Sequence, residues 1–587
     1  MSEPFEDSRR LTGANLYFDG AGAALETAPG LAFDAATLRR WRANVARARA
    51  LLGWAEDAVV VREHATGAAL AFEAPFDQLY AATEVNEWAL YSSLGVRAGD
   101  APVDEDAASP RPHVAHFDDG EALRQLQVLA TAEAKPALRA LVAAARARGV
   151  PAHADDDALS IGEGVGAQAW PLAALPGIGD VPWSRLHAIP KAVVTGSNGK
   201  TTTVRLLAAM LRAHGLHAGY SSTDGLFIDG ERVEAGDYSG PVGARTVLRD
   251  ARVHAAVLET ARGGLLRRGL VASDARVAVV TNVAADHFGE YGIHSLDHIA
   301  AVKLVVAKSL AADGLLVLNA DDAMLAAHAP ASRRIGWFAL ALADATARGL
   351  PACGVRQGRL VLASEAGEHD LGDIAAMPLT VAGAARYNIG NIAAASLAAH
   401  ALGIAPATIA GVLARFGARN ADNPGRLQRW TLGDVEVLLD YAHNPDGLRG
   451  LLGVASGLRR GGRLGLLLGH AGNRLDSDFI ALADVAASAK PDRVWLKDIA
   501  GDYLRGRASG DVAMILRDAL LASGMAGADL PLCLDEALAV REALAWARAG
   551  DLLVLPVHEP ARRDEVVALL DRLRDEGWRA GMPLPLL

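Results

Sequence analysis

The chain has 587 residues, which at about 100–200 residues per domain predicts several domains, each large enough for a core of its own. Hydrophobic residues make up 51% and charged residues 22% of the sequence, and this balance excludes a fibrous or generally disordered protein. The formal net charge of -11 argues against a general nucleic-acid binder, although it leaves room for a local basic cleft.

The cysteines and the N-terminus indicate a cytoplasmic protein. Cys353 and Cys533 lie far apart and follow no metal-ligand spacing, so we expect neither a disulfide framework nor a cysteine-based zinc site. The first ten residues contain acids but no apolar core of a secretory signal. No apolar run approaches the ~20 residues that cross a bilayer, and we therefore expect no membrane association.

Residues 1–187 mix strand-like and helix-like patterns and are predicted to form an α+β domain. The sequence DEDAASPRP at 104–112 predicts an exposed loop, and the glycines at 162, 164 and 166 predict a turn, because no strand and helix frame them. The sequence EVNEW at 84–88 is either a substrate or partner contact or a helix turn beside a buried tryptophan. We favour the second, since tryptophan is mostly buried.

Residues 188–424 alternate short aliphatic runs with helical patterns, which is typical of parallel sheets with crossover helices. The predicted strands are 191–195, 255–260, 277–283 and 314–318, and the predicted helices are 201–213 and 295–311. This pattern predicts a doubly wound α/β domain.

A second α/β series follows Asn423-Pro424-Gly425, whose turn chemistry suits a domain linker. Its predicted strands are 435–440, 463–468, 493–496 and 552–556, and its predicted helices are 446–458, 478–489 and 536–549. We therefore predict a smaller α/β domain over residues 425–587.

The strongest local signal is TGSNGKTTT at 195–203, which follows a predicted strand and opens a predicted helix. Glycines let backbone N–H groups approach phosphate oxygens, a helix N-terminus attracts negative charge, lysine adds a point charge and a threonine hydroxyl can reach Mg²⁺. Two residues separate Gly196 from Gly199, where the general phosphate-loop pattern has four. The predicted ATP contacts are Gly196, Ser197, Asn198, Gly199, Lys200, Thr201 and Thr202.

This shortened loop resembles that of the Mur ligase superfamily of ATP-dependent amide ligases. Glu259 and the sequence NVAADH at 282–287 fall at strand ends, where α/β proteins bind ligands. The sequences YNIGN at 387–391, GR at 425–426 and DYAHNP at 440–445 follow in the family's order. The resemblance implies further ATP contacts at Asn282, Asn388, Asn391, Arg426, Asp440 and His443, and a Mg²⁺ site made by Thr201, Glu259 and His287.

Lys303 lies 16 positions after His287 in a predicted helix and resembles the lysine that many Mur ligases carry as a carbamate. The alternative is an ordinary solvated helix lysine, because a lysine reacts in this way only when burial or neighbouring groups depress its pKa. The sequence leaves both open.

Within the superfamily, the sequences STDG at 222–225, DYSGP at 237–241 and ETARGG at 259–264 resemble the C-terminal ligase half of cyanophycin synthetases. KD at 497–498 and LRGR at 504–507 extend the resemblance, while Asn473 stands where the pattern has an aspartate. The resemblance implies substrate contacts at Asp224, Ser239, Arg245, Arg262, Asp498 and Arg505.

The N-terminal region also resembles those synthetases, through LTGAN at 11–15 and SIGEG at 160–164. The second sequence marks the start of their ATP-grasp module, but about 25 residues later the ligase region begins. This leaves no room for an ATP-grasp domain of ~200 residues. Only the amide-forming chemistry of the Mur-like half is therefore expected, with a separate ATP-grasp synthetase as one source of acceptor.

The resemblance implies an ADP-forming carboxylate–amine ligase that uses ATP and Mg²⁺ to convert an acid to an acyl phosphate, which an amine attacks. An amino acid such as arginine and an acidic peptide or small acid are the leading substrates, and the implied catalytic residues are Lys200, Glu259, His287, Lys303 and Arg426. Two alternatives stay open: a degenerate scaffold that binds a separate synthetase, and a nucleotide-switch ATPase. The acceptor, the amine and homo-oligomerisation are also open.

Overall fold

The computed structural model describes residues 3–31, 34–96, 114–286, 288–499 and 501–585, so the predicted loop at 104–112 and the predicted metal ligand His287 lie outside the described residues. The chain forms two compact units. The first takes in residues 1–318, 322–336 and 398–404, and the second takes in the others. Across the described ranges, no helix combines the length and apolarity that crossing a bilayer requires.

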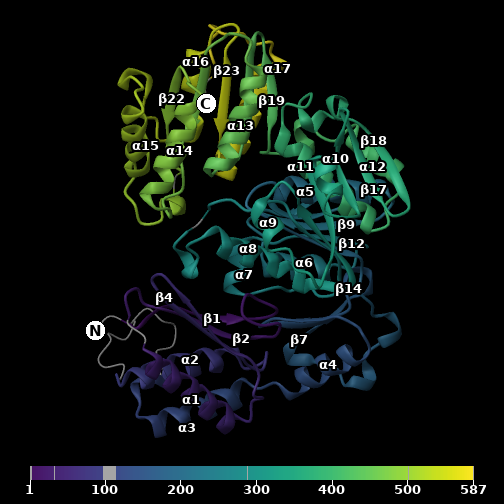
Figure 1. Ribbon diagram of the computed structural model, residues 1–587, viewed down its shortest axis with the longest axis vertical. Coiled ribbons are helices and arrows are strands. Elements are labelled where there is room, and N and C mark those ends of the chain that lie inside the picture. Colours follow the sequence, from purple (N-terminus) through teal and green to yellow (C-terminus); the bar gives the residue numbers. More distant parts are fainter. Residues whose placement is uncertain (1–2, 32–33, 97–113, 287, 500, 586–587) are drawn as a thin grey trace. The chain divides into compact units, whose positions relative to one another are not determined.

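The first unit begins with an antiparallel sheet whose strand order is β1-β2-β4-β3. Three helices, α1, α2 and α3, cover this sheet (Figure 1), and Trp41, Phe72 and Trp88 fill the core between the layers. Trp88 is 1% exposed in α2, which agrees with the favoured interpretation of residues 84–88. The elements are β1 (Phe5–Leu11), β2 (Gly22–Thr27), α1 (Ala35–Leu52), β3 (Val59–His64), β4 (Gly67–Glu73), α2 (Leu79–Leu94) and α3 (Asp119–Glu133).

A smaller antiparallel sheet of β5 (Ala152–Ala154), β6 (Ala158–Ile161) and β7 (Gln168–Pro171) packs with α4 (Pro136–Ala147). Next to it lies a buried ionic cluster. The Glu163 carboxylate is 2.5 Å from Lys191 Nζ and 3.0 Å from His153 Nε2. Burial alone would raise the Glu163 pKa, but the hydrogen bond to His153 and the charge of Lys191 lower it.

This cluster yields a stability prediction. Glu163→Ala should lower the free energy of unfolding by about 3–5 kcal/mol, because it leaves the Lys191 ammonium buried without its counter-charge. Urea unfolding followed by tryptophan fluorescence measures the change. Arg252→Ala is the control, since Arg252 pairs with Asp250 at an exposed position and its loss should leave stability nearly unchanged. Equal losses in the two variants would contradict the prediction.

The main sheet of the first unit has the strand order β11-β10-β9-β12-β8-β13-β14. Strands β9, β12, β8, β13 and β14 are parallel, and β8 is buried along its whole length, as a parallel strand covered on both faces must be. The strands are β8 (Lys191–Thr195), β9 (Ala218–Ser222), β10 (Gly225–Ile228), β11 (Glu231–Glu234), β12 (Ala255–Glu259), β13 (Ala275–Val280) and β14 (Leu310–Asn319). The helices are α5 (Lys200–Ala213), α6 (Pro241–Arg249), α7 (Arg262–Arg267), α8 (Leu296–Leu304) and α9 (Ala323–Ala327).

The second unit contains two groups of strands. In the first, β15 (Arg334–Ala341), β16 (Ala352–Arg356), β17 (Arg359–Ser364) and β18 (Gly367–Asp373) pair in that order, and α10 (Leu342–Thr346), α11 (Arg386–Ala401) and α12 (Pro406–Leu413) accompany them. In the second, the order is β19-β20-β23-β21-β22, parallel except for β19. Those strands are β19 (Gln428–Leu432), β20 (Val435–Asp440), β21 (Leu464–Leu468), β22 (Arg493–Leu496) and β23 (Leu552–Pro556).

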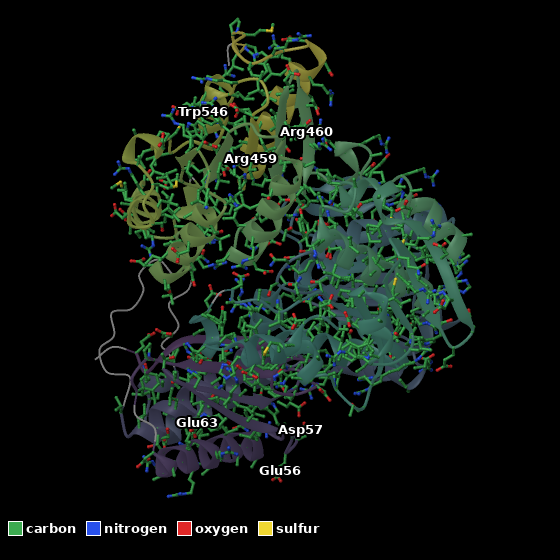
Figure 2. The ribbon with its side chains drawn as sticks, turned by 45° about the horizontal axis from the view of Figure 1, so that its top comes forward. Glu56, Asp57, Glu63, Arg459, Arg460 and Trp546 are labelled. Carbon is green, nitrogen blue, oxygen red and sulfur yellow. The ribbon has the colours of Figure 1, made fainter. Side chains whose placement is uncertain are left out.

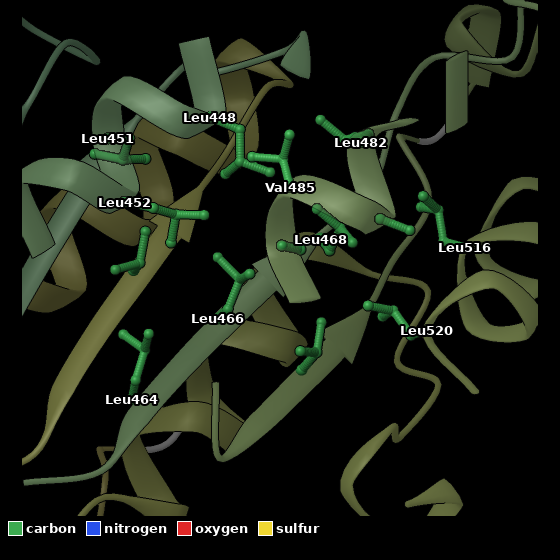
Figure 3. Close-up of a cluster of buried hydrophobic side chains, with 14 of the residues drawn as sticks. Leu448, Leu451, Leu452, Leu464, Leu466, Leu468, Leu482, Val485, Leu516 and Leu520 are labelled. Carbon is green, nitrogen blue, oxygen red and sulfur yellow. The ribbon is translucent and has the colours of Figure 1, made fainter. Parts of the chain in front are cut away.

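Helices cover both faces of this last sheet: α13 (Pro445–Leu458), α14 (Asp476–Ser488), α15 (Asp511–Ala522), α16 (Glu536–Trp546) and α17 (Pro560–Asp575). Figure 3 shows leucines of α13, α14 and α15 meeting Leu464, Leu466 and Leu468 of β21 on one face. Trp430 and Trp578 belong to the core of the other face. The α/β fold class predicted from the sequence, including the α+β N-terminal region, is confirmed.

Some predicted bounds are wrong. The predicted helix 295–311 ends at Leu304 and is followed by a 3-10 turn and by β14, which begins at Leu310. The predicted strand 277–283 ends at Val280, because the residues after it turn to bind the loop that follows β8. The predicted helix 536–549 ends at Trp546. The three-domain division stays a prediction.

Many charged side chains lie at the surface, as Figure 2 shows for Glu56, Asp57 and Glu63, all of which are exposed. Arg459, also labelled there, pairs with Asp492 at 2.8 Å. Surface pairs of this kind contribute about 0–1 kcal/mol each. The acidic net charge therefore describes a solvated surface and by itself indicates no site.

Candidate active site

The loop after β8 can adopt its shape only because of its two glycines. Gly196 has φ 150°, and a Cβ there would lie 1.8 Å from Thr281 Oγ1. Gly199 has φ 85° in the left-handed region and precedes the first residue of α5, where an L side chain would be strained. The loop thus presents backbone N–H groups at a helix N-terminus, which is a ready anion site.

Two residues at the end of β13 hold this loop. Asn198 N donates to Asn282 Oδ1 at 2.9 Å, and Asn282 Nδ2 donates to Asn198 O at 3.1 Å. Thr281 Oγ1 donates to the same carbonyl at 2.5 Å. Asn282, predicted to bind ATP, therefore fixes the backbone of the loop. Thr281 was not among the predicted residues, because the strand was predicted to run through it.

Lys200 lies at the opening of the loop and is half-buried. Its Nζ donates to Gly196 O at 3.0 Å and to Ser197 O at 3.1 Å. The side chain therefore folds back over the loop, where its ammonium can meet a phosphate oxygen as a point charge.

Thr201 and Glu259 bring together oxygen donors from α5 and β12. Thr201 Oγ1 donates to Glu259 Oε2 at 2.9 Å, and the two residues are 5% and 1% exposed. A hydroxyl and a carboxylate are hard ligands that suit Mg²⁺, so the donor chemistry fits the implied metal. Within the described ranges no group of three or more His, Cys, Asp or Glu side chains could hold a metal ion alone, and the predicted third ligand, His287, lies outside them.

Lys303 of α8 is 3% exposed, which excludes a solvated helix lysine. Burial, and next the positive charge of Lys200, hold its pKa well below the ordinary value, while Asp286 opposes the shift. Lys303, Lys200 and Asp286 are therefore close enough to interact electrostatically. A neutral buried amine is the form that a carbamate requires.

The predicted substrate residues of the first unit already contact neighbours. The contacts are Asp224 with Arg205 at 2.8 Å, Ser239 with Asp237 at 2.6 Å, Arg245 with Asp155 at 3.7 Å, and Arg262 with Glu290. Arg262 is 8% exposed and begins α7, directly after β12 and Glu259. A planar guanidinium at this position suits bidentate binding of a carboxylate.

In the second unit, a polar group follows the end of β20. Asp440 Oδ2 accepts from Leu427 N at 2.6 Å. Burial raises the Asp440 pKa, and the charge of Arg426 opposes this. The Arg426 guanidinium lies 4.2 Å from the centre of the Tyr441 ring, and His443 Nδ1 is 3.2 Å from Tyr441 O.

Asn388 and Asn391, at the start of α11, are 1% and 5% exposed. Asn388 Nδ2 donates to Leu379 O at 3.0 Å, and Asn391 Nδ2 donates to Asn388 Oδ1 at 3.0 Å. These bonds order the first turn of the helix, and a nucleotide contact at either residue stays a prediction.

A second buried ionic cluster, not predicted, lies beside the segment after β20. Lys497 Nζ contacts the Glu536 carboxylate and lies 3.0 Å from His558 Nδ1. An ammonium group can only donate hydrogen bonds, so His558 accepts at Nδ1 and carries its proton on Nε2. This Nε2 lies 3.1 Å from Ala442 O, to which it donates. The cluster therefore holds the backbone between Asp440 and His443.

His470, at the end of β21, supports the same segment. Its Nε2 lies 2.6 Å from His443 O, and burial lowers its pKa to about 4. His470, Glu536 and His558 belong to none of the motifs identified in the sequence, whereas Lys497 is the first residue of KD at 497–498.

Asp498 follows Lys497 at the end of β22 and is 3% exposed. Its Oδ2 accepts from Ser509 Oγ at 2.8 Å and from Gly510 N at 2.7 Å. Its buried Oδ1 has no hydrogen-bond partner among the residues that the structure describes. Arg505, also predicted to bind substrate, is exposed and has φ 50°.

Comparison with known families covers most of the chain after the N-terminal region. Residues 194–399 match the Mur ligase middle domain, and residues 425–556 match the family described as Mur ligase, glutamate ligase domain. A UDP-N-acetylmuramoyl-L-alanyl-D-glutamate–2,6-diaminopimelate ligase from Xanthomonas campestris is 32% identical over 417 residues, which are 67% of this chain and 77% of that protein.

Cyanophycin synthetase from a Nostoc species is 36% identical over 394 residues, 66% of this chain and 43% of that protein. The alignment thus spans less than half of that relative. Among solved structures, a diaminopimelate ligase of the same type has 22% identity and a TM-score of 0.40, covering 65% of this chain and 78% of its own. A bifunctional folylpolyglutamate synthase/dihydrofolate synthase from Yersinia pestis has 19% identity and a TM-score of 0.48, covering 65% and 90%.

Proposed function

Because the chain belongs to the Mur ligase family, we propose that it is an ATP-dependent, ADP-forming carboxylate–amine ligase. The observation that carries the proposal is the arrangement in the first unit. Three features come together beside the carboxyl ends of β8 and β12. They are the preformed anion loop with Lys200, the Thr201–Glu259 oxygen pair and the buried Lys303.

The reaction has two steps. A carboxylate oxygen of the acceptor attacks the γ-phosphorus of ATP, the bond from that phosphorus to the bridging oxygen breaks, and ADP leaves. The amine then attacks the acyl carbon, loses a proton to the surroundings, and expels phosphate. When bound, Mg²⁺ supplies positive charge to the phosphoryl oxygens. Lys200 and the N–H groups of the loop add to this charge, and a catalytic role for Arg426 stays a prediction.

The proposed acceptor is an acidic peptide or small acid, and the proposed amine is an amino acid such as arginine. The similarity to cyanophycin synthetase supports this choice, as do the buried guanidinium of Arg262 and the buried carboxylate of Asp498. A carboxylate can bind bidentately to the first, and a cationic group can satisfy Asp498 Oδ1. A separate ATP-grasp synthetase is a proposed source of the acceptor.

Lys303 is proposed to carry a carbamate. Protein equilibrated with ¹³C-bicarbonate near neutral pH should show one slowly exchanging carbamate signal in ¹³C NMR, because burial lowers the Lys303 pKa and so favours the uncharged amine that forms a carbamate. The signal should vanish in Lys303→Arg, whose guanidinium stays protonated. A spectrum without such a signal in the wild type would leave Lys303 as a buried amine.

The test of function is turnover with defined substrates. Incubation with ATP, Mg²⁺, an oligo-aspartate peptide and arginine should release phosphate and add arginine, less one water, to the mass of the peptide. Phosphate release that needs no amine would favour the nucleotide-switch ATPase. Absence of turnover with every acid and amine pair would favour the scaffold. Turnover with a different pair would leave the ligase proposal standing and remove arginine.

A further inference from the structure

The N-terminal sheet contacts the region of the main sheet of the first unit through the sequence LTGAN at residues 11–15. Thr12 N donates to Arg268 O at 2.8 Å, and Leu270 N donates to Ala14 O at 2.7 Å. A Cβ at Gly13 would lie 2.0 Å from Leu270 O, so glycine is needed for this approach. The segment therefore pairs, backbone to backbone, with the residues that follow α7.

Two arginines of the N-terminal sheet extend this contact to the segment around Glu290, residues 289–294, which we call the Glu290 loop. Arg9 of β1 is 3% exposed. Its Nε donates to Leu266 O at 3.0 Å, and its guanidinium lies 4.6 Å from the centre of the Tyr291 ring. Arg62 of β3 donates to Tyr291 O at 3.5 Å and to Gly292 O at 3.2 Å.

The Glu290 loop also fits closely against the last residue of β3. Gly292 has φ 65°, and a Cβ there would lie 2.4 Å from the His64 ring. Thr66 Oγ1 lies 3.2 Å from His64 Nδ1 and 3.3 Å from His294 Nε2. The loop is thus held on one side by the N-terminal sheet, and on the other its Glu290 carboxylate pairs with Arg262.

We propose that the N-terminal region positions the arginine that binds the acceptor. Arg62 fixes the carbonyls of Tyr291 and Gly292, these place Glu290, and Glu290 orients the guanidinium of Arg262. Fixing a free arginine side chain costs rotamer entropy, so prior orientation of Arg262 favours binding. The inference rests on the proposed function, because that proposal assigns Arg262 to the acidic acceptor. Arg62 acts through Glu290 and is a positioning residue.

The first test compares Arg62→Ala with Arg40→Ala. Arg40 also donates to a backbone carbonyl, that of Ser93 at 2.8 Å, but inside the N-terminal region. Fluorescein-labelled octa-aspartate, without ATP, serves as the binding probe. We expect Arg62→Ala to weaken binding about tenfold, a difference of about 1.4 kcal/mol, and to speed amide hydrogen exchange in residues 289–294. Arg40→Ala should leave both unchanged, and Arg62→Lys should recover part of the loss.

The second test approaches the same contact from the loop. Gly292→Ala and Gly289→Ala both place a side chain at positive φ, but a Cβ at Gly289 meets nothing within 4 Å. Both substitutions therefore carry backbone strain, at φ 91° for Gly289 and φ 65° for Gly292, and only Gly292→Ala also meets His64. Weaker octa-aspartate binding in Gly292→Ala alone supports the proposal, and equal effects overturn it.

The outcomes separate this proposal from the proposed function. A wild-type protein that binds octa-aspartate yet forms no amide with any amine would refute the ligase function and leave the positioning role intact. A wild type that does not bind the peptide overturns the positioning role. So does Arg62→Ala with unchanged binding and unchanged exchange.

Discussion

Lys200→Ala should remove ATP turnover while leaving the protein folded. Lys200 is half-buried at the opening of the loop, and its ammonium donates to two carbonyls of that same loop, so no core packing depends on it. Loss of a preorganised charge that stabilises a transferring phosphoryl group typically lowers the rate about 10²–10³-fold. Single-turnover phosphate release measures the loss of ATP turnover, and thermal unfolding of the same sample measures whether the variant stays folded.

Lys490→Ala provides the control for this experiment. Lys490 is exposed just after α14, so its loss changes the net charge by the same amount far along the chain from the loop. Its turnover should match that of the wild type. A folded Lys200→Ala variant with near-normal turnover would refute the role given to the loop.

Glu259→Gln should raise the Mg²⁺ concentration needed for half-maximal turnover at least tenfold. The amide oxygen of glutamine can still accept the hydrogen bond from Thr201, which spans 2.9 Å in the wild type, so the local packing is kept. The negative charge that binds a hard cation is lost. Magnesium titration of turnover at fixed ATP measures the effect.

Glu163→Gln is the matched control, since Glu163 is also a buried glutamate and contacts Lys191, the first residue of β8. Glu163→Gln should lower the free energy of unfolding but leave the Mg²⁺ concentration for half-maximal turnover unchanged. An unchanged titration in Glu259→Gln would remove Glu259 from the metal site.

The parallel strands were the most predictable part of the fold. Strands β8, β20, β22 and β23 have the bounds that the sequence indicates, because strands buried on both faces appear as unbroken aliphatic runs. Strands such as β11, with the sequence ERVE, and β18, with GEHDLGD, carry no such run and were missed. The predicted helix 295–311 ran into β14 because both segments are apolar and no glycine or proline separates them.

The residues of the candidate site could be predicted where they lie close together in one sequence motif or at the end of a predicted strand. The loop at 196–199, Lys200 and Thr201 share one motif, and Glu259 ends a recognisable strand. Contacts between residues that are far apart in the sequence could not be predicted. Lys497 meets Glu536 and His558 across 39 and 61 positions, and a sequence pattern does not contain that pairing. The burial of a side chain could not be predicted either, which is why the sequence could not distinguish a buried Lys303 from a solvated one.

The two buried Lys–Glu–His clusters differ in how freely they can change over evolutionary time. One contains Lys191 at the amino end of β8, and the other contains Lys497 just past the carboxyl end of β22. Ionic clusters can be exchanged for well-packed apolar side chains with little loss of stability, so lineages can drift to such a core at Glu163 and Lys191. At Lys497 the same exchange would release the Ala442 carbonyl from His558 and disturb the segment that carries Asp440 and His443. Among descendants of this chain, amino-acid substitutions should therefore be frequent in the cluster of Glu163 and Lys191 and rare in the cluster of Lys497.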